Sequence, residues 1–208
     1  MTNLDLPKKD ENGISYISYS QIQLFKKDRE EYHQRYILSQ KFEGNAYTDF
    51  GSKVGKALET GDYNSFSTRE ITTLKKCERL DEFEKRVKIN FEGFYVLGFI
   101  DTISKDYSKI IDYKTGGANK EYQYNKEEYT QLCYYALAIR QEFGITPKTA
   151  QVNFIRRKGN AFKGENLTVG NEVKIIDVDI TYNRLKKVYW EIITVANQIE
   201  SFYKLYKL

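Results

Sequence analysis

The sequence predicts an α/β fold in which helices flank a central mixed β-sheet and the N-terminal half is mostly helical. In the first ninety residues, apolar side chains recur at helical spacing after Ser-led capping patterns. From residue 91 the pattern changes to aromatic and β-branched runs, which are typical of strands. A helix, two further strands and a final helix follow, and this alternation is typical of a sheet with helices packed on its faces.

Capping patterns and apolar spacing place the elements of the first half. Ser18 is followed three residues later by Gln21, and Ser67 by Glu70, the arrangement in which a side chain at a helix start accepts a backbone N–H bond. Apolar residues at helical spacing follow both pairs. The expected elements are a polar lead over residues 1–12 that need not be ordered, a helix over 19–38, a loop over 44–50, a short helix after 51 and one or two helices between 68 and 90.

Glycines and β-branched runs place the elements of the second half. Gly116 and Gly117 end the run of strands, and Gly144 ahead of Pro147 is typical of a helix end. Thr181 is expected to cap the last helix. The expected elements are a three-stranded meander over 91–97, 98–104 and 109–114, a helix over 127–143, strands over 150–157 and 172–180 with a loop over 158–170 between them, and a helix from 182 to about 206.

Composition narrows the class of function. The chain has 208 residues, which favours one domain, and a net charge of +4, which permits a nucleic-acid partner without requiring one. Its one histidine, His33, disfavours Ser-His-Asp and Cys-His nucleophile systems. Two cysteines cannot build a disulfide framework, and no stretch reaches the roughly 20 apolar residues of a membrane span. We expect a protein of a reducing cytoplasm without a membrane partner, whose chemistry uses carboxylates, lysines and a metal.

Two acidic residues and a lysine at strand positions form the candidate site. Asp112 and Lys114 are two residues apart, so in a strand their side chains leave the same face. Asp101 ends the preceding expected strand, and a short connection would bring it near Asp112. Two facing carboxylates repel each other unless a cation lies between them, and Mg²⁺ prefers such oxygen ligands. The alternative is a sheet edge held by salt bridges.

This ordered set of residues resembles the PD-(D/E)XK nuclease superfamily, in particular its RecB-like exonuclease branch. The matching segments are Gly98-Phe-Ile-Asp101, Ile110-Ile-Asp112-Tyr-Lys114-Thr-Gly116 and Gln131-Leu-Cys-Tyr-Tyr135. The resemblance implies a restriction-endonuclease-like core that spans residues 1–208 as one nuclease domain. It further implies that Asp101 and Asp112 bind Mg²⁺ or Mn²⁺, that Lys114 assists the attack of water, and that Gln131 and Tyr135 line the site from one helical face. For Gln131 and Tyr135 the alternative is a core tyrosine with a paired amide.

The resemblance fails at two places. Family members often carry a metal-binding histidine in a G-x-x-x-H helix, and here Gly55 follows Gly51 at that spacing. Glu59, one turn further on, is the expected substitute as a metal ligand or its neighbour, with the Tyr113 backbone carbonyl as a further ligand; the alternative is a solvated helix-end glutamate. The second failure concerns the iron-sulfur cluster of some relatives, which needs four cysteines. Only Cys77 and Cys133 are present, so no cluster is expected and both should be buried.

Cationic and aromatic residues near these segments are candidates for contact with DNA. The cations are Arg156, Arg157, Lys158 and Lys163, which can instead be a solvated face. Three tyrosines beside the site could stack on unpaired bases: Tyr113, Tyr122 and Tyr124.

The resemblance therefore implies a metal-dependent DNA nuclease, an exonuclease acting on linear duplex or single strands, with a role in recombination, repair or phage DNA processing in a bacterial or phage-infected cytoplasm. The alternative is a catalytically weakened nuclease fold that serves as a DNA-binding or protein-interaction module, which the missing histidine and the modest charge would favour. A nuclease acting on RNA would differ only in substrate.

Overall fold

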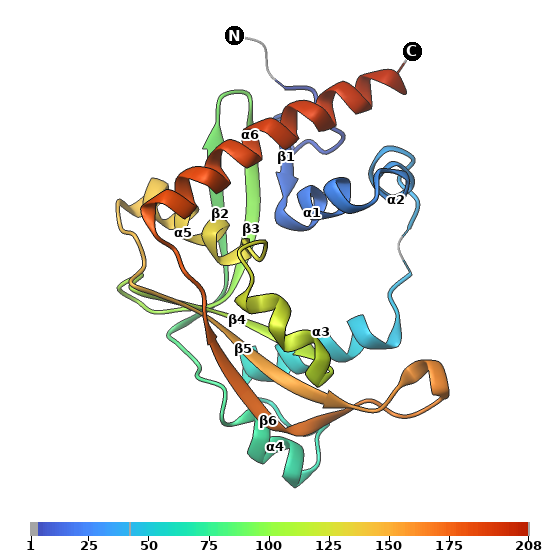
Figure 1. The fold of residues 1–208 in the computed structure, drawn as a ribbon, viewed down its shortest axis with the longest axis vertical. Helices are drawn as coiled ribbons and strands as arrows, with labels where there is room; N and C mark the ends of the chain where they lie inside the picture. The colour runs from blue at the N-terminus through green and yellow to red at the C-terminus, as the bar shows by residue number, and fades with distance from the viewer. Residues whose placement is uncertain (1–3, 42, 208) are drawn as a thin grey trace.

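A twisted mixed sheet with helices on both faces organises the protein in a computed structural model that describes residues 4–41 and 43–207 (Figure 1). Its strands within these residues are β1 (Ser15–Ser18), β2 (Glu82–Phe91), β3 (Phe94–Ile103), β4 (Lys109–Gly116), β5 (Thr149–Lys158) and β6 (Thr168–Asp177). The helices are α1 (Tyr19–Lys27), α2 (Arg29–Tyr32), the π-helical η1 (His33–Ile37), α3 (Ala46–Thr60), α4 (Thr68–Leu74), the 3-10 helix η2 (Ala118–Asn125), α5 (Gln131–Phe143), the 3-10 turn η3 (Ala161–Lys163) and α6 (Tyr182–Leu205).

Strand β3 is the centre of the sheet and has differently paired edges. β2 runs antiparallel along one edge. The other edge is shared: β1 pairs in parallel up to Leu97, and β4 pairs antiparallel only at Thr102 and Ile103. β5 continues in parallel from β4, and β6 is antiparallel to β5. Residues 98–101 of β3 consequently have no strand partner on the edge that faces β4.

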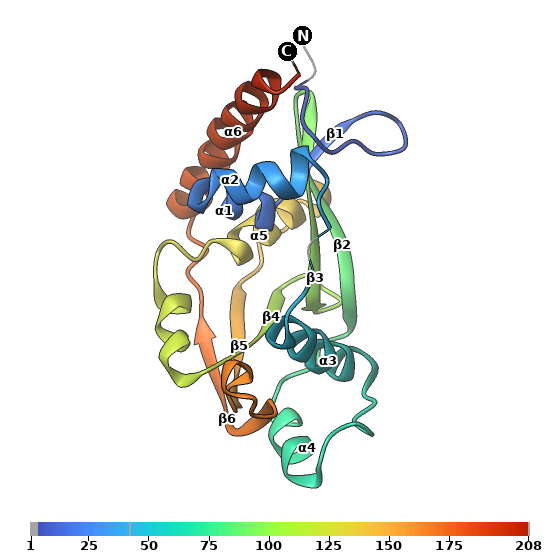
Figure 2. The same ribbon diagram turned by 90° about the vertical axis from the view of Figure 1, so that its right-hand side faces the viewer.

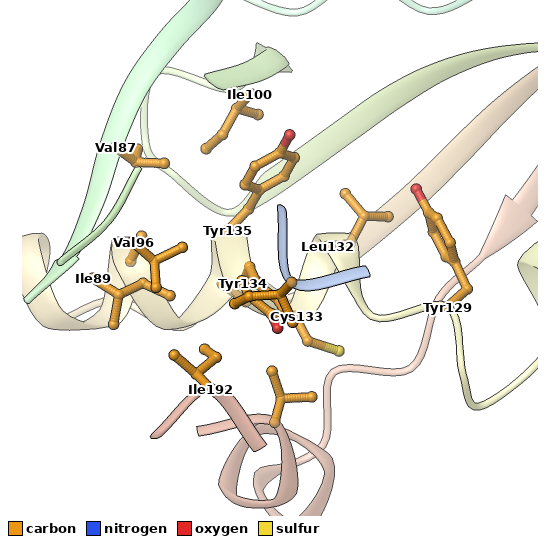
Figure 3. Close-up of a cluster of buried hydrophobic side chains, with 14 of the residues drawn as sticks. Val87, Ile89, Val96, Ile100, Tyr129, Leu132, Cys133, Tyr134, Tyr135 and Ile192 are labelled. Atoms are coloured by element: carbon orange, nitrogen blue, oxygen red, sulfur yellow. The ribbon is translucent and has the colours of Figure 1, made fainter. Parts of the chain in front are cut away.

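The helices form two layers with separate cores. α5 packs on β2 and β3, and α6 packs on α5 and α1, which encloses the larger core; Figure 3 shows Leu132 to Tyr135 of α5 among side chains of β2, β3 and α6. α3 packs on β3 and β4 and α4 on β6, over a smaller core that includes Val54 and Leu58. Figure 2 shows α1 and α2 above α3 and α4 along the long axis. In the part of the chain that is described, no helix has the length and apolar character of a membrane span.

Several sequence predictions are confirmed. The α/β class with a central mixed sheet is correct. The Ser18 side chain accepts the Gln21 N–H at the start of α1, and Ser67 and Glu70 cap α4 reciprocally. α5 ends at Gly144, whose φ of 72° is in the left-handed region that glycine adopts without steric cost.

Four helix predictions need correction. The helix expected over 19–38 is broken at Asp28, whose extended backbone and side-chain bond to the Glu31 N–H start a second helix. α3 begins within the expected loop, because the Asn45 side chain accepts the N–H groups of Tyr47 and Thr48. α5 begins at residue 131 rather than 127, and Thr181 precedes α6 without a side-chain capping bond.

The prediction of helix up to residue 90 is wrong, because residues 82–91 form strand β2. Val87 and Ile89 are buried while Arg86 and Asn90 are exposed, which is the two-residue period of a strand with one face against a core. The chain reverses at Gly93, with φ of 83°, so the expected break before Gly98 lies inside β3.

The strand β1 and the packing of the lead were not foreseen. Leu6 of the expected polar lead is fully buried, and its N–H donates to the Ser15 hydroxyl. Residues 1–3 lie outside the described part of the chain.

Candidate active site

The candidate site lies where β3 and β4 separate. β4 leaves β3 after the pair Thr102–Ile111, and the Asp101 carboxylate occupies the opening. Its Oδ2 accepts the Tyr113 N–H at 2.6 Å, a main-chain bond that a neighbouring strand would otherwise receive. The segment Gly98-Phe-Ile-Asp101 is thus the part of the β3 edge that pairs with neither β1 nor β4. Gly98, Phe99 and Asp101 of this segment line a cavity.

Strand alternation places Asp112 and Lys114 on one face of β4, as expected. Asp112 is fully buried, and its Oδ2 accepts bonds from the Lys114 ammonium at 2.7 Å and from the Tyr129 hydroxyl at 3.0 Å. Its Oδ1 is buried without a hydrogen-bond partner among the described residues. Burial of a charged oxygen without a partner costs free energy of folding, and a bound cation would offset this cost. Asp112 Oδ1 is therefore a candidate metal ligand.

The electrostatics of these three groups are coupled. Burial, and then the nearby Asp112 charge, raise the pKa of Asp101 to about 7. Burial alone would lower the pKa of Lys114, but the Asp112 and Asp101 carboxylates outweigh it and raise that pKa. Lys114 therefore remains a cation at neutral pH, with its side chain 28% exposed.

Gln131 and Tyr135 lie one turn apart on α5, as expected, and are bonded to each other, an arrangement that also matches the alternative of a core tyrosine with a paired amide. The Gln131 amide donates to the Tyr135 hydroxyl at 2.7 Å, and both line the cleft beside Asp101. Tyr129, which sequence reasoning missed, joins this group to the carboxylates through its bond to Asp112. In the sequence, the only indication of this role is that Tyr129 lies two residues before Gln131.

Two cavities meet at the carboxylates. The smaller, of about 380 Å³, lies under α3 and is lined among others by Gly55, Lys56 and Glu59. The larger, of about 670 Å³, lies beside α1 and α5 and is lined among others by Tyr19, Lys27, Tyr36 and Phe99. Both cavities are also lined by Asp101, Lys114 and Glu84.

The structure puts the expected Glu59 in the smaller cavity, and Gly55 beside it. Both carboxylate oxygens of Glu59 contact the Lys56 ammonium, at 3.0 and 3.1 Å. A Cβ atom at Gly55 would meet nothing within 4 Å, so open space lies where the family histidine would project. Glu84 on β2 was missed, because its segment was assigned to a helix.

The expected DNA contacts are only partly available. Arg156 is paired with Glu121 at 2.8 Å and Glu172 at 2.5 Å, and Arg157 stacks over the Tyr47 ring at 4.0 Å. The remaining two cations of the set are exposed and form no ion pair with any described residue: Lys158 and Lys163.

Two of the three tyrosines expected to stack on bases pack against the protein instead. The Tyr113 hydroxyl donates to the Glu78 carbonyl at 2.6 Å, and Tyr124 is buried edge-on against Tyr129. Tyr122 is 61% exposed, and the Lys126 ammonium lies over its ring, 4.8 Å from the centroid.

The donor atoms fit a hard divalent cation, although the described residues do not already gather three metal-ligating side chains. The fit rests on the buried Asp112 Oδ1 without a partner and on the carboxylate of Asp101 next to it. The cysteines are placed elsewhere: Cys77 and Cys133 are buried in the two separate cores, as expected.

Residues 63–188 match the family model of the PD-(D/E)XK nuclease superfamily. The chain belongs to the PD-(D/E)XK nuclease superfamily. The matched segment contains Asp101, Asp112, Lys114, Gln131 and Tyr135, whereas Glu59 precedes it.

Solved structures agree with this fold. A candidate exonuclease from Eubacterium rectale superposes with a TM-score of 0.60 at 13% identity, covering 91% of this chain and 82% of that one. A phage-related exonuclease from Haemophilus somnus gives a TM-score of 0.43 at 14% identity, with 90% and 80% covered. A search of curated protein sequences returns no significant match. The family match and the superposition on the Eubacterium rectale structure agree on the fold of the superfamily, and Asp101, Asp112 and Lys114 lie where β3 and β4 separate.

Proposed function

We propose that this chain is a divalent-metal-dependent DNA nuclease of the RecB-like branch that degrades linear DNA from its ends. The Asp112 carboxylate supports this most directly, because it is buried beside Asp101 and Lys114 and keeps one oxygen without a partner. Such an oxygen pair from two carboxylates suits Mg²⁺ or Mn²⁺, which nucleases of this superfamily generally use.

Each residue has a proposed task. Asp101 and Asp112 hold the cation, with Glu59 and the Tyr113 carbonyl as assisting groups. The bound cation supplies Lewis-acid activation of water and of the phosphodiester oxygens. Lys114, kept cationic by the two carboxylates, donates to the attacking water or to a phosphate oxygen and stabilises the negative charge that grows there.

The surroundings of the site hold the substrate. Gln131 and Tyr135 line the larger cavity and position the phosphate beside Lys114. Lys158 at the end of β5 and Lys163 in the connection to β6 contact the DNA backbone, with Arg157 and Arg156 preceding them on β5. The biological role that we propose, recombination, repair or phage DNA processing in the cytoplasm, rests on family likeness alone.

The test is incubation of the purified protein with end-labelled linear duplex, single-stranded and closed circular DNA in Mn²⁺, Mg²⁺ or EDTA. We expect metal-dependent loss of linear but not circular DNA. Lys114→Ala should lower the rate by at least about a hundredfold, whereas Lys186→Ala, an exposed lysine of α6 that lines neither cavity, should not. Cleavage of circular DNA would make the protein an endonuclease, and full activity of Lys114→Ala would contradict the site assignment.

The open space at Gly55 favours a second candidate, a weakened nuclease fold that binds DNA without cutting it. Metal binding separates the two, because an intact site should raise the melting temperature as Mn²⁺ is added. If the protein binds DNA without cutting it, and Mn²⁺ does not change its melting temperature, the protein is a binding module. If Mn²⁺ raises the melting temperature equally in Asp101→Asn, the ligand assignment is wrong.

A further inference from the structure

Glu84 stands across from Asp101 in the sheet. In the antiparallel pairing of β2 and β3, Phe83 faces Thr102 and Lys85 faces Ile100, so Glu84 occupies the position opposite Asp101. Both side chains line the same two cavities. Like charges directly across two strands destabilise a sheet unless something lies between them. This position therefore needs an explanation other than fold stability.

The Glu84 carboxylate is also free to bind. It forms no hydrogen bond or ion pair with any residue in the described ranges, and the side chain is exposed. Lys56, which lines the smaller cavity with Glu84, contacts both oxygens of Glu59 instead. By contrast Glu82, two residues earlier on β2, is paired with Lys85 at 2.7 Å. Glu84 also has φ of 47°, a left-handed conformation uncommon for a non-glycine residue.

The charges around the smaller cavity leave room for one divalent cation. Three carboxylates and two ammonium groups line it, and Asp112 contacts the Lys114 ammonium from behind; the lining groups are Glu59, Glu84 and Asp101 with Lys56 and Lys114. With all of them ionised, the deficit of two positive charges equals the charge of one Mg²⁺ or Mn²⁺. The fully buried Asp112 Oδ1, which has no partner among the described residues, independently points to a cation at the same place.

We propose that Glu84 is a third carboxylate ligand of the divalent cation, contributed by β2 rather than by α3. The inference rests on the proposed function, since it assumes that Asp101 and Asp112 hold the cation. Three side-chain ligands are not yet gathered within the described residues, so the exposed Glu84 side chain turns toward Asp101 as the cation binds. Its free torsions make this movement inexpensive, and the cation removes the repulsion between the two strands.

The test measures binding of Mn²⁺ alone, without DNA, by calorimetry and by the loss of the free Mn²⁺ electron-spin signal. Four proteins are compared: wild type, Glu84→Gln, the matched control Glu82→Gln and Asp112→Asn. We expect Glu84→Gln to weaken Mn²⁺ binding by about tenfold or more, because affinity follows the number of charged ligands. Glu82→Gln should bind as the wild type does, and Asp112→Asn should lose binding.

The outcomes distinguish a failure of the Glu84 ligand from a failure of the proposed metal site at Asp101 and Asp112. If Glu84→Gln binds Mn²⁺ as the wild type does while Asp112→Asn does not, the third ligand is wrong and the metal site stands. If Asp112→Asn also binds normally, the proposed metal site itself fails. If Glu84→Gln and Glu82→Gln weaken Mn²⁺ binding equally, the effect comes from the general surface charge, and Glu84 is not a ligand. Circular dichroism of each variant establishes that the fold is retained.

Discussion

The two carboxylates of the site, Asp112 fully buried and Asp101 half-buried, are held at a cost to the fold. They come from separate strands and repel each other, and among the described residues Lys114 is the cation paired with Asp112. Tyr129 donates to Asp112 but carries no charge, because burial raises its pKa well above the ordinary value of a tyrosine. The residues that define the site are therefore arranged for a ligand rather than for stability.

The first prediction concerns the pH dependence of stability. Burial and the Asp112 charge raise the pKa of Asp101 to about 7 in the folded protein, against about 3.9 in an unfolded chain. Between these values the folded state binds more protons, so the contribution of Asp101 to stability falls as pH rises through the window and is lowest above pH 7. We expect Asp101→Asn to melt at a higher temperature than the wild type in EDTA, with a gain that grows from pH 4 to 7.

Thermal melts of both proteins across this range, in EDTA, check the prediction. Subtracting one curve from the other cancels groups that do not interact with Asp101, such as Asp106, whose pKa is lowered to about 2 by bonds from Ser104 and Ser108. A difference in melting temperature that is independent of pH would contradict the raised pKa.

At the scale of elements, the unpaired stretch of β3 and helix α5 fit together closely. A Cβ atom at Gly98 would lie 3.0 Å from Cε1 of Tyr135, whose ring is buried and whose hydroxyl is bonded to Gln131. The glycine that begins the first motif is thus required by packing against the residue that ends the last one.

Gly98→Ala should consequently destabilise the protein by about 1–3 kcal/mol, the usual cost of overpacking a core. Urea unfolding measures it. Gly55→Ala is the control, because its Cβ meets open space and alanine favours a helix, so stability should stay equal or rise. If Gly98→Ala is as stable as wild type, Tyr135 is less fixed than its contacts indicate.

Helix α3 offers space for the ligand that family members often have. Gly55→His places an imidazole at the wall of the smaller cavity, which also holds Asp101 and Glu59. We expect Mn²⁺ affinity to rise on the order of tenfold, and Mg²⁺ affinity less, because imidazole is a softer ligand than carboxylate. Calorimetric titration of Gly55→His against Gly55→Ala measures this. No difference between them would place Gly55 away from the metal.

At the scale of the whole molecule, the net charge is only +4, so contact with DNA depends on where exposed lysines lie relative to the site. Lys158 ends β5 and Lys163 lies in the connection to β6, which is tied to α3 because the Tyr47 hydroxyl donates to Asn160 and accepts the Ala161 N–H, each at 3.1 Å. The exposed lysines are thereby fixed next to the helix that lines the smaller cavity. This arrangement suits contact with phosphates that enter the site.

The double variant Lys158→Ala, Lys163→Ala should weaken DNA binding and lower the slope of log affinity against log salt by about 2, one per lost phosphate contact. Fluorescence anisotropy in EDTA at several salt concentrations measures the slope without cleavage. Lys186→Ala serves as control. An unchanged slope would place the DNA path elsewhere, and the larger cavity with Lys27 and Tyr36 is then the next region to test.

Local patterns predicted much of the fold and part of the site. The order of strands and helices from residue 109 onward, the caps at Ser18 and Ser67, and the shared face of Asp112 and Lys114 all follow from spacing within a few residues. The strand β2 was mistaken for helix because a capping pattern and many charges preceded it, although Val87 and Ile89 alternate with polar residues.

By itself, the sequence determined which chemical groups are available and, through the strand period, that a carboxylate and a lysine share one face of β4. Tertiary structure decided that β1 and β4 leave the β3 edge open at Asp101, that Tyr129 reaches Asp112, and that Glu84 faces the same opening. The physical reason is distance along the chain: these arrangements depend on contacts between residues a dozen or more positions apart, which spacing within one segment does not encode.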